Sequence, residues 1–219
     1  MRQQRPRGTT TREAVVDAAL QIVDRVGIDC VTIRAIARLV NAPPMSLYTH
    51  FANKEELLDL MYAEMARRLY PDSGQATWQT ALAAMARHLR DTLLAHPHWT
   101  PLISRQAPPT PMPSRERLLK LMVDARMSAE QALRGMSAVL VSSIGLTLVE
   151  LTFRDSDGSS AFARRFERQR SWLEKTGEPK LEPTSREAFA RMQSFEFAKS
   201  FEFTLKTMID GLELGLRAS

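Results

Sequence analysis

The chain of 219 residues repeats one pattern, in which a Ser, Thr or Asn precedes apolar residues spaced three and four positions apart. A hydroxyl or amide side chain at that place caps the first turn of a helix, and the apolar spacing gives the helix one face for a core. No segment alternates apolar and polar residues over a useful length, as a half-buried strand would. The sequence therefore predicts an all-α fold.

Composition supports a packed chain. Hydrophobic residues make up 44% and charged residues 25%, which excludes a disordered or collagen-like chain because enough apolar surface is available to offset the ordering entropy. The single cysteine, Cys30, cannot form a disulfide within the chain and favours a reducing compartment. The basic N-terminus lacks the apolar core of a secretory signal, so we expect a cytoplasmic protein.

The predicted helices divide the chain into three parts. Residues 1–52 form a three-helix domain with a helix-turn-helix, residues 53–70 a connecting helix, and residues 71–219 a larger all-α regulatory, ligand-binding and dimerisation domain. The first helix is expected to begin with a capping box of Thr10 and Glu13. Helices are predicted at residues 10–26, 32–40, 43–51, 53–70, 76–95, 114–125, 128–153 and 195–217, with further helical segments at 161–175 and from Thr184.

The longest uncharged run lies between Arg134 and Glu150 and holds fifteen residues. This run is too short to span a bilayer, so no membrane partner is predicted. A helix that is apolar nearly all round is instead buried, either in the centre of a domain or against a partner subunit.

Residues 32–54 carry the strongest functional pattern, which is a short helix, a tight turn at Asn41 and a second short helix. A second helix of this kind enters the major groove of DNA, where its first residues meet base edges and flanking groups hold phosphates. The net charge of +5 and the acid-free segments 1–12 and 30–54 agree with a polyanionic partner. The spacing alone leaves a plain helical hairpin equally open, and the arginines of residues 1–12 suit either the minor groove or a solvated tail.

A resemblance favours DNA binding. The stretches Thr32–Ala37, Ser46–Phe51 and Asn53–Leu58 resemble the DNA-binding signature of the tetracycline-repressor (TetR) family. The sequence departs from that family at Asn41, where glycine is usual, and at Pro43 and Met45, where small residues are common. These departures leave the expected fold unchanged and bear on the operator sequence.

The resemblance also implies roles for single residues. Phosphate contacts are expected for Tyr48, His50 and Lys54, and base contacts at or near Arg34 and residues 43–46. The candidate DNA-binding residues are Thr32, Arg34, Pro43, Pro44, Met45, Ser46, Tyr48, Thr49, His50 and Lys54. The expected partner is a double-stranded DNA operator, which is palindromic because a two-fold symmetric dimer binds it.

The C-terminal part is similar to the tetracycline repressor's own subclass in three patches, at residues 78–96, 128–139 and 201–213. In that subclass the long helix and the last helix pair with their counterparts in a second chain. The resemblance therefore implies a homodimer through the helices near 130–150 and 195–217. The same apolar stripes also suit a core within one chain, which is the alternative.

That subclass holds a magnesium-bound drug, but the residues at the corresponding positions differ here. They are Tyr70, Met85, Ile103 and Val149, with Glu150 one residue away. Apolar side chains cannot replace the imidazole and carboxylate groups that a hydrated magnesium chelate needs. We therefore expect a small apolar or aromatic effector in place of tetracycline, and no cofactor.

The candidate ligand-binding residues are mostly apolar, with Gln106 as a polar anchor. They are Tyr70, Met85, Leu89, Ile103, Gln106, Leu118, Leu133, Met136 and Val149. Such a lining suits an apolar or aromatic small molecule. Methionine and leucine at helical spacing are core residues first, so a filled core is the alternative.

The sequence holds no catalytic motif and no metal site. His96 and His98 flank Pro97 without a third ligand at a recognisable spacing. The prediction is a ligand-responsive homodimeric regulator, most readily a repressor. A small-molecule-binding helical dimer without specific DNA binding is the alternative, because Pro43 and Met45 supply few hydrogen bonds to bases, and an enzyme that uses the apolar pocket comes third.

Overall fold

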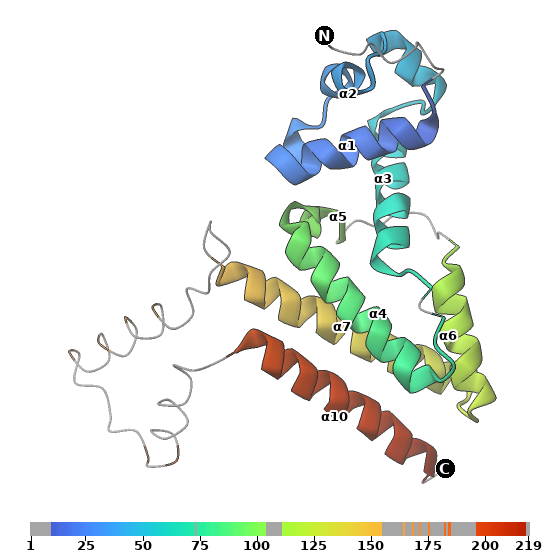
Figure 1. The fold of residues 1–219 in the computed structure, drawn as a ribbon, viewed down its shortest axis with the longest axis vertical. Coiled ribbons are helices and arrows are strands. Elements are labelled where there is room, and N and C mark those ends of the chain that lie inside the picture. The colour runs from blue at the N-terminus through green and yellow to red at the C-terminus, as the bar shows by residue number, and fades with distance from the viewer. Residues whose placement is uncertain are drawn as a thin grey trace, which may run out of the picture.

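The computed structural model describes residues 10–72, 74–103, 111–154 and 196–217, together with positions 164, 168, 171, 175, 182 and 184. The regular elements within these residues are helices, as predicted (Figure 1). Residues 1–9 and Gln106 lie outside the described residues, and so do most of the predicted segments at 161–175 and beyond Thr184.

The N-terminal elements are α1 (Arg12–Val26), the 3-10 helix η1 (Ile28–Cys30), α2 (Ile33–Val40), the 3-10 helix η2 (Pro44–Thr49) and α3 (Lys54–Leu69). The C-terminal elements are α4 (Trp78–Ala95), the 3-10 helix η3 (Pro97–Trp99), α5 (Thr100–Ile103), α6 (Pro113–Asp124), α7 (Ala129–Thr152) and α10 (Phe197–Arg217). In Figure 1, α1 and α2 lie at one end of the molecule, and α3 runs from them towards the C-terminal helices.

Polar side chains begin the helices where the sequence places them, with one exception. Thr32 and Asn53 cap α2 and α3, and Ser128 forms a complete capping box with Gln131 at the start of α7. The prediction for α1 was wrong by one residue, because the Oγ1 atom of Thr11 accepts the hydrogen bond from the Ala14 N–H at 3.2 Å. Three consecutive threonines each offer a cap, and spacing does not choose among them.

Two clusters of buried apolar residues hold the elements together. The first joins α1, α2, η2 and α3 to the C-terminal end of α4, η3 and α5 through Leu89, Leu93, Trp99 and Leu102. The second joins α4, α6, α7 and α10. The N-terminal helices therefore pack directly on the C-terminal helices, so a shift of α4 would displace its contacts with α1 and α3.

α7 is, in the described part of the chain, the one helix long and apolar enough to cross a membrane by length and composition. Its 24 residues exceed the uncharged run of the sequence, so the length argument against a membrane span was wrong. The helix packs against α4, α6 and α10 and buries Ala132, Met136, Val139 and Leu140. This packing is typical of the central helix of a helical domain.

Candidate nucleic-acid interface

The turn between α2 and η2 depends on Asn41. This residue adopts the left-handed conformation, with φ 53° and ψ 47°, which asparagine tolerates better than most residues. The Ala42 N–H then donates to the Ala37 carbonyl oxygen at 3.0 Å and closes the end of α2. The predicted helix end at this residue is confirmed, and the turn fixes the direction in which η2 leaves α2.

η2 is a 3-10 helix over Pro44–Thr49, whereas the sequence predicted a helix that reached Phe51. The tighter winding follows from local hydrogen bonds, since the Ser46 N–H donates to the Pro43 carbonyl at 3.0 Å and the His50 N–H to the Leu47 carbonyl at 2.9 Å. Leu47 is fully buried and anchors the element to the core of α1–α3. The exposed residues of η2 therefore lie on a short element that is anchored by its buried leucine.

Six of the ten predicted DNA-binding residues line one groove, namely Arg34, Pro43, Pro44, Ser46, Thr49 and His50. Most of the side chains are exposed, and Ser46 and His50 are half-buried. A groove between α2 and η2 is lined by Thr10, Arg34, Ala37, Arg38, Asn41, Ala42, Pro43, Pro44, Ser46, Thr49 and His50. Thr32 differs in role, because its hydroxyl oxygen accepts from the Ala35 N–H at 3.2 Å and serves as a helix cap.

Arg38 and Thr10 belong to this groove, but sequence reasoning did not include them among the candidates. Arg38 lies four residues after Arg34 on the same helix, a spacing that places both side chains on one face and could have found it. Two arginines therefore border the groove, where the sequence analysis proposed one.

The basic side chains Arg34, Arg38 and Lys54 have no acidic partner within ion-pair distance in the part of the chain that the structure describes. Elsewhere cations face acids, as Arg68 does with Asp17 and Glu64, and Arg87 with Glu202. Unpaired guanidinium and ammonium groups beside an open groove are suited to hold phosphate oxygens.

The predicted ligand-binding residues fall into two groups. Met85, Leu89, Leu118 and Met136 are buried in the two cores, and Tyr70 and Ile103 are half-buried beside them. Burial raises the pKa of the Tyr70 phenol above its ordinary value, so this side chain is neutral.

Leu133 and Val149 do not line the interior with the others. Their exposed fractions in the single chain are 50% and 49%, on the side of α7 away from its core contacts. A helix that is apolar nearly all round does not disclose which stripe faces its own chain, so this exposure could not be predicted from the sequence.

A buried charged cluster joins α4, α7 and α10. The Arg90 guanidinium of α4 donates to the Glu150 carboxylate of α7 at 2.7 Å and lies over the Phe201 ring of α10, 5.3 Å from its centroid. Glu150 also faces Arg154 at 3.5 Å. Breaking one member of a buried pair is costly, since the other charge is left uncompensated. Sequence analysis missed the pairing because the two residues are sixty positions apart.

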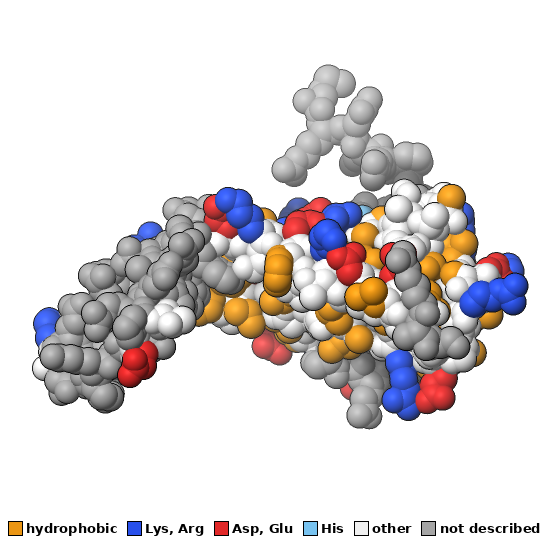
Figure 2. Space-filling model, turned by 90° about the horizontal axis from the view of Figure 1, so that it is seen from below, with side chains coloured by type: hydrophobic (Ala, Val, Ile, Leu, Met, Phe, Trp, Pro, Cys, Tyr) orange, Lys and Arg blue, Asp and Glu red, His pale blue; other side chains and the backbone are white. Residues whose placement is uncertain are grey.

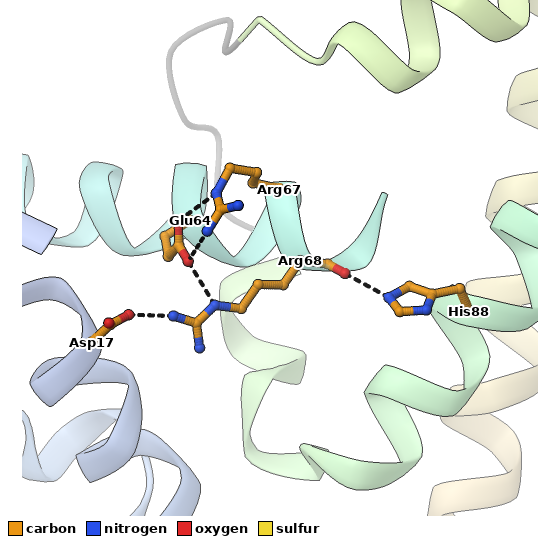
Figure 3. A network of polar contacts seen from close by, with 5 residues as sticks. All are labelled: Asp17, Glu64, Arg67, Arg68 and His88. Carbon is orange, nitrogen blue, oxygen red and sulfur yellow. Dashed lines mark hydrogen bonds and ion pairs between the residues drawn. The ribbon is translucent and has the colours of Figure 1, made fainter. Parts of the chain in front are cut away.

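Polar contacts tie the connecting helix α3 to both of its neighbours (Figure 3). The side chain of Arg68 bonds Asp17 of α1 and the Glu64 carboxylate, which also accepts two bonds from Arg67 at 2.8 and 2.7 Å. The backbone carbonyl of Arg68 accepts from His88 Nε2 of α4 at 2.8 Å. Hydrogen bonds from Arg67, with a smaller effect of Arg68, lower the pKa of Glu64.

A second contact ties α1 directly to η3 and the end of α4. The His96 Nδ1 donates to the Asp24 carboxylate at 2.9 Å, and the His98 Nδ1 lies 3.2 and 3.1 Å from the Val23 and Asp24 carbonyls. Both histidines are therefore engaged by α1. The described residues contain no group of three side chains placed to hold a metal ion.

Exposed apolar side chains lie on the two helices that were expected to pair with a second chain. α7 exposes Leu133, Val141 and Val149, and α10 exposes Phe203 and Leu214. Figure 2 shows hydrophobic side chains along the face of the molecule where α10 lies. Between Arg134 and Glu150, α7 carries no charge on any face. Such an uncharged face is typical of a surface that another subunit covers.

The fold and this interface define a helix-turn-helix DNA-binding regulator with a helical C-terminal domain. Residues 15–61 match the bacterial regulatory proteins of the tetR family, and residues 70–216 match the tetracyclin repressor-like C-terminal domain. The chain belongs to the TetR family of bacterial transcriptional regulators. Members of this family are not enzymes, which agrees with the lack of a catalytic motif in the sequence.

Several relatives of this chain are named as repressors. The chain is 27% identical to the tetracycline repressor protein class D of Escherichia coli over 212 residues, which cover 94% of this chain and 91% of that protein. It is 36% identical to the HTH-type transcriptional repressor DrrR1 of Streptomyces coeruleorubidus over 121 residues, which cover 53% of this chain and 44% of DrrR1.

Solved structures agree with the fold. Apo ActR from Streptomyces coelicolor is 25% identical and superposes with a TM-score of 0.73 over 97% of this chain and 99% of that one. ActR has also been solved in complex with actinorhodin, with a TM-score of 0.72 to this chain. A tetracycline repressor variant from Acinetobacter baumannii in complex with minocycline has the same fold, at 21% identity and a TM-score of 0.68.

Proposed function

We propose that the protein is a homodimeric repressor that binds a palindromic DNA operator through α2 and η2 and leaves it when a small effector binds. The observation that carries this proposal is the groove between α2 and η2, which Arg34 and Arg38 border without a carboxylate partner among the described residues. Residues 1–52 would bind DNA, residues 53–70 would connect, and residues 71–219 would bind the effector and dimerise. Such a regulator works in the cytoplasm, where the DNA is.

Dimerisation is supported by the exposed apolar face of α7 and α10. Val141 and Phe203 are 66% and 74% exposed in the single chain, an arrangement that costs free energy unless a partner covers them. A two-fold axis at these helices would hold the two copies of η2 at a fixed distance from each other. Such a pair would bind a palindromic DNA sequence whose half-sites are spaced by that distance.

The effector proposed is apolar or aromatic and differs from a magnesium-bound tetracycline. Tyr70, Met85 and Ile103 offer no ligand that Mg²⁺ prefers, and the Glu150 carboxylate is already paired with Arg90 at 2.7 Å. ActR binds actinorhodin, a fact that is in keeping with an aromatic effector.

Release follows from the packing of α4 against α1 and α3. Suppose that an effector binds better to a dimer whose two copies of α2 and η2 are too far apart or too close together to fit the operator. The effector must then weaken DNA binding by the same coupling free energy. The polar contacts Asp24–His96 and Arg68–His88 would transmit a movement of α4 to α1 and α3, and so to α2 and η2.

Selection of random duplex DNA by the purified full-length protein tests the proposal. An enriched palindrome whose affinity falls steeply with salt supports it. If only weak binding without sequence preference is found, the alternative function is supported, which is a small-molecule-binding helical dimer without specific DNA binding.

A further inference from the structure

We propose that Met45 reads the C5-methyl group of a thymine in each operator half-site, so that an A·T pair is required where η2 meets the bases. The inference rests on the proposed function, since it assumes that η2 enters the major groove. It goes further by naming the base that this element selects.

Met45 stands apart from the other methionines among the described residues. Its exposed fraction is 77%, whereas Met61, Met65, Met85, Met122, Met127 and Met136 are all 4% exposed or less. Its neighbours Pro43 and Pro44 are exposed as well, so the start of η2 forms a small apolar surface. A flexible thioether in this place can adapt its shape to a methyl group that it meets.

The two aliphatic hydroxyl groups of η2, those of Ser46 and Thr49, already donate their hydrogens to carbonyl oxygens of residues 43–46. The Ser46 hydroxyl donates to the Pro43 carbonyl at 2.7 Å, and the Thr49 hydroxyl donates to the Ser46 carbonyl at 2.8 Å. Pro43 and Pro44 have no backbone N–H. In this arrangement, residues 43–46 present apolar carbon, the thioether sulfur and the oxygen lone pairs of Ser46 to the groove, and no side-chain donor.

The hydrogen-bonding groups that each base pair presents in the major groove indicate which base these side chains prefer. Guanine presents two acceptors, N7 and O6, and its recognition by side chains needs donor groups that the side chains of residues 43–46 do not offer. Thymine is the base with a methyl group, and its partner adenine offers an N6 donor that a serine oxygen can accept. An A·T pair therefore matches the start of η2, and recognition of a G·C pair is left to Arg34 or Arg38 on α2.

The test replaces single thymines of the selected operator by deoxyuridine, which lacks only the C5-methyl group. At one position in each half-site, we expect the wild-type protein to lose about fourfold in affinity per half-site, the value of one buried methyl group. Met45→Ala should lose affinity for the thymine operator and show no further loss on the deoxyuridine operator. Met45→Leu, which keeps an apolar side chain of similar size, should retain most of the discrimination.

The outcomes separate this inference from the proposed function. A selected palindrome that tolerates deoxyuridine at every position, or a Met45→Ala variant as sensitive to deoxyuridine as the wild type, would overturn the methyl contact and leave the repressor proposal standing. Failure to select any sequence would overturn both. Circular dichroism of the variants should match the wild type, since the Met45 side chain is exposed.

Discussion

The Nδ1 atom of His96 lies 2.9 Å from the Oδ1 atom of Asp24, and this contact joins the end of α4 to α1. The His96 ring also stacks on Trp99, with centroids 4.2 Å apart. Trp99 is fully buried between the N-terminal helices and the larger helical part. The link between α1 and the C-terminal end of α4 is therefore both polar and apolar.

The first prediction concerns this link. His96→Ala and Asp24→Ala should each lower the free energy of unfolding by up to about 1 kcal/mol, since the pair is partly exposed. The double variant should cost less than the two single costs combined, because both remove one interaction. Urea unfolding of the four proteins measures the coupling. Fully additive costs would show that the contact contributes nothing.

The second prediction concerns the dimer. Val141→Asp places a charge in the centre of the uncharged face of α7 and should dissociate the dimer into monomers. Val123→Asp on α6 is the matched control, since Val123 is also exposed and lies outside that face. Sedimentation velocity distinguishes the two. A dimer that survives Val141→Asp would rule out this face as the interface.

The third prediction separates base contacts from phosphate contacts. Arg34→Ala should change the preference among operator variants at one position of each half-site, at a cost of about 1–3 kcal/mol for the lost base contact. Competition binding with a set of single-base operator variants measures this preference. An equal loss on every variant would instead assign Arg34 to a phosphate.

The fourth prediction concerns acid. Two hydrogen bonds from Arg87 lower the pKa of Glu202 below its ordinary 4.5. A carboxyl whose pKa is lower in the folded chain adds stability above its unfolded pKa and loses it as the pH falls through the folded pKa. Glu202→Gln should therefore cost up to about 1 kcal/mol at neutral pH, since the pair is half exposed, and the cost should be smaller at pH 3. Urea unfolding at both pH values checks this, and a cost that is undiminished at pH 3 would contradict it.

The sequence predicts elements that local chemistry decides. Thr32, Asn41 and Ser128 end or begin helices as expected, because a cap needs only its own turn. The winding of η2 was missed, since it depends on backbone N–H bonds to carbonyls three residues earlier, such as those of Ser46 to Pro43 and of His50 to Leu47.

Contacts between residues far apart in the chain could not be predicted from the sequence. Asp24 and His96 are 72 positions apart, and nothing in the spacing of either residue indicates its partner. Six of the predicted residues nevertheless line one groove, because α2 and η2 are short elements joined by a single turn; they are Arg34, Pro43, Pro44, Ser46, Thr49 and His50.

The measurement that tests the central claim most directly is the salt dependence of affinity for the selected palindrome, compared between wild type and Lys54→Ala. Lys54 begins α3, five residues after the end of η2, and has no acidic partner among the described residues, so two copies in a dimer should hold two phosphates. The account predicts weaker binding and a slope of log affinity against log salt that is smaller by about two. Lys120→Ala, which removes a lysine paired with Asp124 on α6, should leave the slope unchanged. An unchanged slope for Lys54→Ala would contradict the proposed docking on DNA.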